Sequence, residues 1–288
     1  MEVGSEQKDW PRIALLPKVV LLLVCLFIAS MSASASDTGV DSIRAADNAV
    51  WLNAGSSHLY YKETNLAGDT ADTENGWIPA ASVGLNFLSG NESKYADNLY
   101  LALEGRWLSG YTHYNGTLLV SGAPYQVTTA ENVWTTNGRL GKGFAINDSF
   151  LSIPFAELGF RYWHRDLGAY AEDYHNFEAL GGLLVQYSPA SWLVISLSGA
   201  GGTTFAPAMT ATNPTTHFDL GNMPIWKVNG TVGYAVTERF EALVSIDYVQ
   251  FKFGESQLVF NPNDGHHYYE PNSQTGQLTT QIGLAYHY

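Results

Sequence analysis

Cysteine is nearly absent from this chain, since its 288 residues contain only Cys25. That residue lies in an uncharged apolar run over 19–29, which follows basic residues. Small residues come next and end in Ala33-Ser34-Ala35, a sequence that fits the cleavage site of an export signal. We therefore expect a signal peptide over 1–35 and a mature chain that enters an oxidising compartment without disulfides.

A membrane anchor and a lipidated N-terminus are the two other interpretations of this segment. A spanning helix needs about 20 apolar residues, and the run over 19–29 is much shorter. A lipidated cysteine would mark the end of the apolar run, whereas Leu26, Phe27 and Ile28 continue it past Cys25. Export with cleavage is the favoured interpretation.

Charge is also scarce. Charged residues make up 14% of the chain, against about 25% in typical soluble domains. Basic residues are the rarer sign: 14 Lys and Arg against 27 Asp and Glu give a formal net charge of −13. Nucleic-acid binding requires a basic face, so that class of partner is excluded. After the signal, no apolar run reaches the length of a membrane-spanning helix.

Sequence motifs of the common enzyme classes are missing as well. The chain has no phosphate-binding loop, no Gly-x-Ser-x-Gly elbow and no zinc-hydrolase helix. We therefore expect no catalytic residue, no metal and no cofactor.

The C-terminal segment 278–288 shows strict alternation. One parity holds Leu278, Ile282, Leu284, Tyr286 and Tyr288, and the other holds polar or small residues. Period two predicts a β-strand with one apolar face that runs to the end of the chain. Such a face is unfavourable when exposed to water, but it suits an outer-membrane barrel, where lipid covers it.

The same alternation predicts ten strands after the signal. They are 50–61, 77–88, 98–111, 132–146, 150–165, 176–187, 192–205, 225–236, 239–253 and 278–288. Long polar linkers alternate with tight ones, the long ones being 62–76, 112–131, 166–175, 206–224 and 254–275. This rhythm is typical of an all-β, antiparallel up-and-down transmembrane β-barrel with long outer loops. Eight or twelve strands stay possible, because the first and fourth strands are weakly defined.

The domain organisation follows from this strand pattern. We expect a short periplasmic segment over 36–49 and a barrel over 50–288. An even number of strands places both termini on the periplasmic side.

Charged residues gather on the strand face opposite to the apolar face. They are Glu104, Arg106, Glu157, Arg161, Lys227, Glu241 and Asp247. A secreted β-sandwich would carry an apolar inward face instead. The pattern favours a barrel with lipid outside and these seven residues inside. We interpret them as an ion-paired plug, because an unpaired buried charge is costly; a selectivity ring in a small pore is the alternative.

Three segments give the chain a resemblance to bacterial outer-membrane β-barrel proteins of the OmpA-like or opacity-protein type. They are the terminal residues 283–288 (GLAYHY), residues 138–144 (GRLGKGF) and residues 157–163 (ELGFRYW). The resemblance implies that Leu284, Tyr286 and Tyr288 form the signal read by the barrel-assembly machinery. Members usually end in Phe, so Tyr288 is a mild departure from the pattern.

The resemblance also implies a place in the bacterial outer membrane, with lipopolysaccharide as a lipid partner. We expect a non-enzymatic envelope or surface-contact role, with a narrow diffusion channel as the alternative. A third hypothesis is a hydrolase similar to the omptin proteases, which use acidic residues and a His–Asp pair near the outer rim. His217 and Asp219 lie in a predicted outer loop, but the linker 112–131 offers only Glu131 for the acidic pair.

Two further groups of residues have structural explanations. Acidic and histidine residues recur in the predicted outer loops, but without the fixed spacing of a metal site; they are Asp69, Asp72, Glu74, Glu172, Asp173, His175, His266 and His267. Tryptophans recur near strand ends, as in interfacial belts, and these are Trp51, Trp77, Trp107, Trp134, Trp163, Trp192 and Trp226.

Overall fold

The structure is a computed structural model that describes residues 39–65, 67–90, 97–117, 123–213, 215–262 and 265–288. The predicted signal peptide and its cleavage site lie outside these residues.

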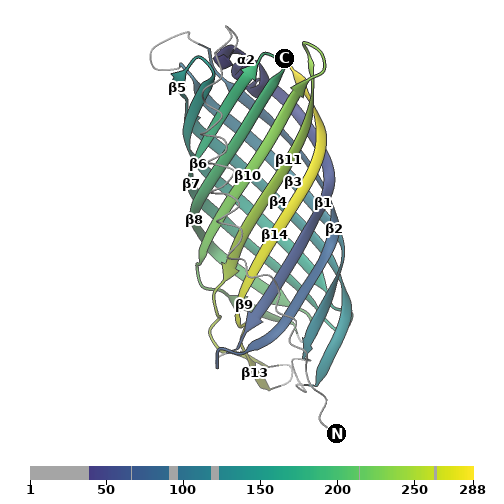
Figure 1. The fold of residues 1–288 in the computed structure, drawn as a ribbon. Coiled ribbons are helices and arrows are strands. Elements are labelled where there is room, and N and C mark those ends of the chain that lie inside the picture. Colours follow the sequence, from purple (N-terminus) through teal and green to yellow (C-terminus); the bar gives the residue numbers. More distant parts are fainter. Residues whose placement is uncertain (1–38, 66, 91–96, 118–122, 214, 263–264) are drawn as a thin grey trace. The chain divides into compact units, whose positions relative to one another are not determined.

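Ten long antiparallel strands of the described chain form a closed β-barrel (Figure 1). Neighbours in the ring are β10, β11, β14, β1, β2, β3, β4, β6, β7 and β8, and pairing of β8 with β10 closes it. The strands are β1 (Ala49–Thr64), β2 (Thr70–Leu88), β3 (Leu99–Thr117), β4 (Pro124–Lys142), β6 (Phe150–Asp166), β7 (Ala171–Ala190), β8 (Leu193–Ala211), β10 (Pro224–Ala235), β11 (Phe240–Phe253) and β14 (Asn272–His287). The prediction of a ten-stranded antiparallel barrel is confirmed.

Short elements lie at the two ends of the barrel. The helix α2 (Gly39–Asp47), the short strand β5 (Phe144–Asn147) and the C-terminus lie at one end, which we call the helix end (Figure 1). At the other, which we call the loop end, lie β9 (Thr216–Asp219), β12 (Val259–Asn261) and β13 (His266–Tyr268).

The strands are longer at the loop end than the sequence predicted. The expected long linkers 62–76, 112–131 and 166–175 are mostly strand, and the connections shrink to 65–69, 118–123 and 167–170. Glycines with positive φ, Gly68 (86°) and Gly168 (78°), make two of these turns tight. The prediction of long outer loops was therefore wrong for these three connections. The prediction ended each strand where the apolar alternation ends, whereas the strands continue past that point with polar residues on both faces.

The barrel wall separates apolar from polar residues by parity. On β6, Leu158 on the outside is 66% exposed, whereas Glu157 beside it is 1% exposed. On β14, Ile282 is 70% exposed and Gln281 is buried. Exposed apolar side chains on every long strand form a continuous outer surface of the kind that lipid covers. Among the described residues, no helix combines the length and apolar character needed to cross a membrane.

Aromatic side chains bound this apolar surface at both ends. On β2, Trp77 and Phe87 both face outward and lie ten positions apart. At about 3.4 Å per residue and a tilt of about 40°, they mark a band of about 26 Å in height, close to the apolar thickness of a barrel membrane protein. Ring pairs continue the two girdles: Trp107 with Trp134 toward the loop end, and Trp192 with Tyr234 at the helix end.

Two tryptophans do not join these girdles. Trp163 is fully buried inside the barrel, and Trp51 lines a cavity in the lumen. The interfacial prediction was wrong for these two, because both share the inward parity of their strands.

Helix α2 fills the lumen at the helix end. Ile43 is fully buried in an apolar cluster with strand residues that include Tyr100, Leu151 and Leu184. Asn48 follows the helix and ties it to β2: its amide donates to the carbonyl oxygens of Arg44 and Leu88. The sequence did not predict this helix within the segment 36–49.

The C-terminal strand supports a prediction about assembly. Leu284, Tyr286 and Tyr288 all face outward, and the Tyr288 hydroxyl donates to the backbone oxygen of Asn86 over 2.8 Å. Tyr288→Asp places a charge on the lipid-facing rim, so the fraction of chain assembled in the membrane should fall several-fold. Heat-modifiable gel mobility of membrane fractions measures it. Tyr288→Phe is the matched control and should assemble normally; full assembly of the Asp variant would contradict the assigned role.

Candidate functional site

Eight charged side chains form what we call the middle ionic layer of the lumen. They are Glu104, Arg106, Arg139, Glu157, Arg161, Glu178, Lys227 and Asp247. Four are acidic and four are basic, so the layer is electrically balanced. Arg106 lies 2.8 Å from Glu104 and 3.1 Å from Asp247, and Lys227 lies 2.7 Å from both Glu157 and Glu178. Each charge therefore has an opposite partner, which offsets the cost of burying it.

Two hydrogen bonds cross the full width of the lumen. The Arg161 Nη1 donates to Gln277 Oε1 over 3.1 Å, joining β6 to β14. The hydroxyls of Tyr61 and Tyr174 lie 3.3 Å apart, joining β1 to β7. In each case the two strands are five steps apart around a ring of ten, counted in either direction. Opposite walls of the barrel are thus in direct contact at these two levels.

The seven predicted lumen residues all face inward, and all of them except Glu241 belong to the middle ionic layer. Glu104 pairs with Arg106. Glu157 does not pair with Arg161; instead Glu157 pairs with Arg139 and Lys227, and Arg161 with Glu178. Glu241 lies closer to the helix end, where its carboxylate is 3.2 Å from His287 Nε2. The sequence interpretation missed Arg139 and Glu178, although both have the inward parity.

A layer of aromatic and aliphatic side chains lies between the middle ionic layer and the loop end. Trp163, Tyr61, Tyr174, Phe251 and Phe253 are among its buried members. Their rings are in contact, with centroids 5.4 Å apart for Tyr61 and Trp163 and 5.0 Å for Tyr174 and Phe253. This layer is an apolar core inside the barrel, and it fills the lumen at this level.

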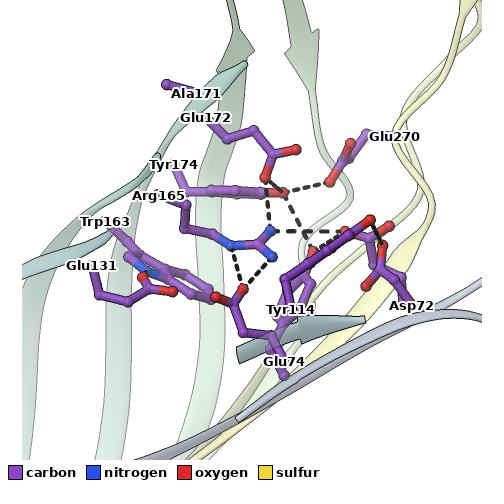
Figure 2. Close-up of polar contacts among 12 residues, drawn as sticks. Asp72, Glu74, Tyr114, Glu131, Trp163, Arg165, Ala171, Glu172, Tyr174 and Glu270 are labelled. Carbon is purple, nitrogen blue, oxygen red and sulfur yellow. Dashed lines mark hydrogen bonds and ion pairs between the residues drawn. The ribbon is translucent and has the colours of Figure 1, made fainter. Parts of the chain in front are cut away.

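A second set of charges, the loop-end cluster, surrounds Arg165 (Figure 2). It contains six carboxyl groups, from Glu63, Asp72, Glu74, Glu131, Glu172 and Glu270. Arg165 is fully buried; its Nε lies 3.0 Å from Glu74 and its Nη1 2.7 Å from Glu172. The guanidinium also stacks over the Tyr61 ring, 4.1 Å from its centroid. One arginine therefore holds together carboxyls from several strands.

Neighbouring carboxyls in this cluster lie close to one another. Glu63 and Asp72 pair in register between β1 and β2, and the Thr112 hydroxyl is in contact with the carboxyls of both Glu74 and Glu131. Among the described residues, Arg165 forms ion pairs with three of the six carboxyls, those of Glu63, Glu74 and Glu172.

Glu270 closes the cluster from the connection before β14. Its Oε1 accepts a hydrogen bond from the Tyr174 hydroxyl over 2.6 Å. Burial, together with the nearby Glu63 and Glu172, raises the pKa of Glu270 well above its usual value. The sequence predicted Asp72, Glu74 and Glu172 in outer loops; that prediction is wrong, because all three lie on strands and face the lumen.

Between α2 and the middle ionic layer lies a polar chamber of about 140 Å³. Within the described part of the chain, five of its buried side-chain atoms have no protein partner, namely Asp47 Oδ2, Asn53 Oδ1, Gln186 Oε1, Asp247 Oδ2 and Gln281 Nε2. Such a lining is the environment that ordered water prefers.

Asp47 in this chamber gives a pH-dependent prediction. Burial first, and the charge of Glu241 next, raise its pKa from 3.8 to about 7 despite a hydrogen bond from Gln186. Because the pKa is higher in the folded than in the unfolded state, the stability it contributes is full below about pH 4 and is lost as the pH rises through about 7. Asp47→Asn does not titrate and should stabilise docking of α2 at pH 8 by roughly 2–4 kcal/mol.

Hydrogen exchange of the α2 amides at pH 5 and pH 8 measures this effect. The matched control is Asp41→Asn on the same helix, whose side chain is 87% exposed. Equal pH dependence of α2 protection in the Asp47→Asn variant and the unmodified protein would contradict the prediction.

The candidate residues for hydrolysis and metal binding lie elsewhere. His217 and Asp219 on β9 are 3.6 Å apart, but both are exposed on the face of the strand opposite to the buried Phe218. They therefore point away from the interior where the acidic residues gather. Asp173 pairs on the outer wall with His164 at 2.8 Å. Over the described ranges, no group of three or more His, Cys, Asp or Glu is placed to hold a metal ion.

Comparisons with known proteins bear on the fold. No protein-family model and no curated sequence matches the chain. Among solved structures, the outer-membrane protease OmpT from Escherichia coli has a TM-score of 0.58 at 10% identity, over 84% of this chain and 97% of that one.

Two other similar structures have lower TM-scores. Neisserial surface protein A has a TM-score of 0.31 at 14% identity, over 83% of this chain and 97% of that one. The toluene transporter TodX of Pseudomonas putida has a TM-score of 0.30 at 9% identity, over 87% and 92%. These two scores are too low to assign a shared topology. The likeness to OmpT shows the fold of an outer-membrane barrel, and the comparisons do not single out the OmpA-like type.

Proposed function

We propose that this protein is an integral barrel of the bacterial outer membrane with a sealed lumen, and that it acts through its loop end in a non-enzymatic envelope or surface-contact role. The observation that most supports a sealed lumen is the pair of hydrogen bonds between diametrically opposite strands, Arg161 to Gln277 and Tyr61 to Tyr174. A pore that conducts ions needs an open path along its axis. Side chains that meet across the axis at two levels interrupt such a path, and the aromatic layer around Tyr61 and Tyr174 occupies the lumen beside the second contact.

The outer surface supports the membrane location. Lipid removes apolar side chains from water without any need for a protein partner, and here they form a band of suitable height between two aromatic girdles. Ten strands with both ends of the barrel domain at the helix end support an orientation with that end in the periplasm.

Cysteine labelling tests this orientation cleanly, because the predicted mature chain contains no cysteine. Asp219→Cys introduces a thiol at the loop end and Thr237→Cys one at the helix end, both at exposed positions. In whole cells, a membrane-impermeant maleimide should label the first variant and not the second, and both after lysis. Labelling of Thr237→Cys in intact cells would reverse the proposed orientation.

A narrow diffusion channel is the second candidate, and the polar chamber behind α2 favours it. Movement of α2 would open this chamber at the helix end. Efflux of a small ionic dye from vesicles separates the two candidates, because a sealed barrel retains the dye and a channel releases it. Peptide hydrolysis by the folded protein that is lost in His217→Ala would overturn the non-enzymatic part of the proposal.

A further inference from the structure

Basic residues are distributed unevenly over the barrel. The described residues contain ten Lys and Arg, counted from the sequence as Arg44, Lys62, Arg106, Arg139, Lys142, Arg161, Arg165, Lys227, Arg239 and Lys252. Five of these face the lumen in the two ionic clusters. Three lie at the helix end, on α2, at the end of β4 and in the turn before β11. The remaining two, Lys62 and Lys252, lie on the outer wall near the loop end.

These two lysines are neighbours on the wall. Lys62 on β1 and Lys252 on β11 both pair in register with Gln274 on β14, the strand between them. The three strands lie side by side in Figure 1. The Cα atoms of Lys62 and Lys252 are separated by two strand spacings, about 10 Å. Two flexible four-carbon side chains span that distance from either side, so both ammonium groups can reach one anion.

Neither lysine forms an ion pair with a carboxylate of the described residues, although Glu255 follows Lys252 by three positions in the chain. The outward positions around them on β2, β1, β14, β11 and β10 hold uncharged residues. Next in register to Lys62 on β2 is Thr73. In contrast, the wall formed by β6 and β7 carries Asp173 beside His164 at its loop end. On a chain of net charge −13, this is a local positive surface.

Apolar side chains continue below the lysines toward the helix end. Tyr60, two residues before Lys62, is 36% exposed. Ile246 on β11 and Ile282 on β14 lie farther down the same wall, at 52% and 70% exposure. A molecule held here would meet cations at one end and a tall apolar surface at the other. The two cations suit the phosphate headgroup of a lipid, and the apolar surface below them suits its acyl chains.

We propose that this wall binds the phosphate of an outer-leaflet lipid, held between Lys62 and Lys252 over Gln274, with the acyl chains against the apolar side chains beneath. This inference rests on the proposed membrane placement with the loop end outside. It is independent of whether the lumen conducts.

The test titrates folded protein in non-ionic detergent with bis-phosphorylated lipid A and follows binding by native mass spectrometry. The Lys62→Gln/Lys252→Gln variant should lose about 30-fold in affinity, since each lysine near an anionic lipid contributes a factor of about five. Lipid A stripped of both phosphates should bind the unmodified protein as weakly as the phosphorylated form binds the variant.

The matched control removes two charges at the helix end, as Lys142→Gln/Arg239→Gln, and should bind within two-fold of the unmodified protein. Lys62→Arg/Lys252→Arg keeps the charges and should retain binding. Both lysines are on the surface, so their loss should leave gel mobility of the folded barrel unchanged. Unchanged affinity in the Lys62→Gln/Lys252→Gln variant, equal loss in the helix-end control, or insensitivity to lipid phosphate would each overturn the inference. Dye release by the folded protein with lipid binding intact would refute the sealed lumen alone, whereas reversed labelling would refute both the orientation and the outer-leaflet lipid.

Discussion

Replacing Arg165 with methionine should destabilise the barrel by about 3–5 kcal/mol at neutral pH, because removal of the arginine leaves buried carboxylates without a cation. Arg165 is fully buried and is the basic residue of the loop-end cluster within the described chain. Glu74 and Glu172 would lose their direct ion pairs, at 3.0 and 2.7 Å. Urea unfolding in detergent, followed by gel mobility, measures the change.

Acid should relieve most of that loss. As the pH falls, the carboxyls left without a cation take up protons, and the cost of burying their charge disappears. The deficit of the Arg165→Met variant should therefore be smaller at pH 4.5 than at pH 7.5. Arg165→Lys, which keeps the charge but not the planar fork, should lose an intermediate amount. The exposed Arg239→Met is the matched control. A deficit of Arg165→Met under about 1 kcal/mol at neutral pH would contradict the assigned role of the cluster.

Replacing Lys227 with methionine should have the second largest destabilising effect, a loss of about 3 kcal/mol. The lysine ammonium lies 2.7 Å from Glu157 and 2.7 Å from Glu178, whose side chains are 0% and 1% exposed. Each carboxylate keeps one arginine partner, Arg139 or Arg161, so the loss should be smaller than for Arg165. The middle ionic layer would then carry one unbalanced negative charge.

A second substitution separates charge balance from lost packing. Adding Glu157→Gln to Lys227→Met restores neutrality in the layer and should recover more than half of the lost stability. The single Glu157→Gln variant, with Lys227 intact, is the control and should itself be destabilised. No recovery in the double variant would show that electrostatic balance is not what this layer provides.

The sequence predicted the wall of this barrel well, because a strand displays its two faces with a period of two. Glu157 and Leu158 are adjacent, and their opposite burial follows from parity alone. Which side chains contact one another inside the lumen was harder to predict. Arg161 and Gln277 are 116 residues apart and meet because the stagger between strands sets their heights. No local pattern encodes that stagger.

The loop-end cluster was missed for a different reason. Strands were predicted to end where the apolar parity ends, and Glu74 and Glu172 lie beyond that point. Their inward parity was available as a signal: Arg165 continues the face of Arg161, and Glu172 continues the face of Glu178. When both faces of a strand are polar, hydrophobic periodicity no longer marks it. At this end of a barrel, charged residues that continue on the inward-facing positions past the apolar belt indicate the strand better.

Single-channel recording of the refolded protein in a planar bilayer tests the central claim most directly. If opposite walls meet across the axis through Arg161 and Gln277 and through Tyr61 and Tyr174, inserted protein should be electrically silent, while heat-modifiable mobility shows that it is folded. Stable, reproducible conductance steps from the folded protein would contradict the account.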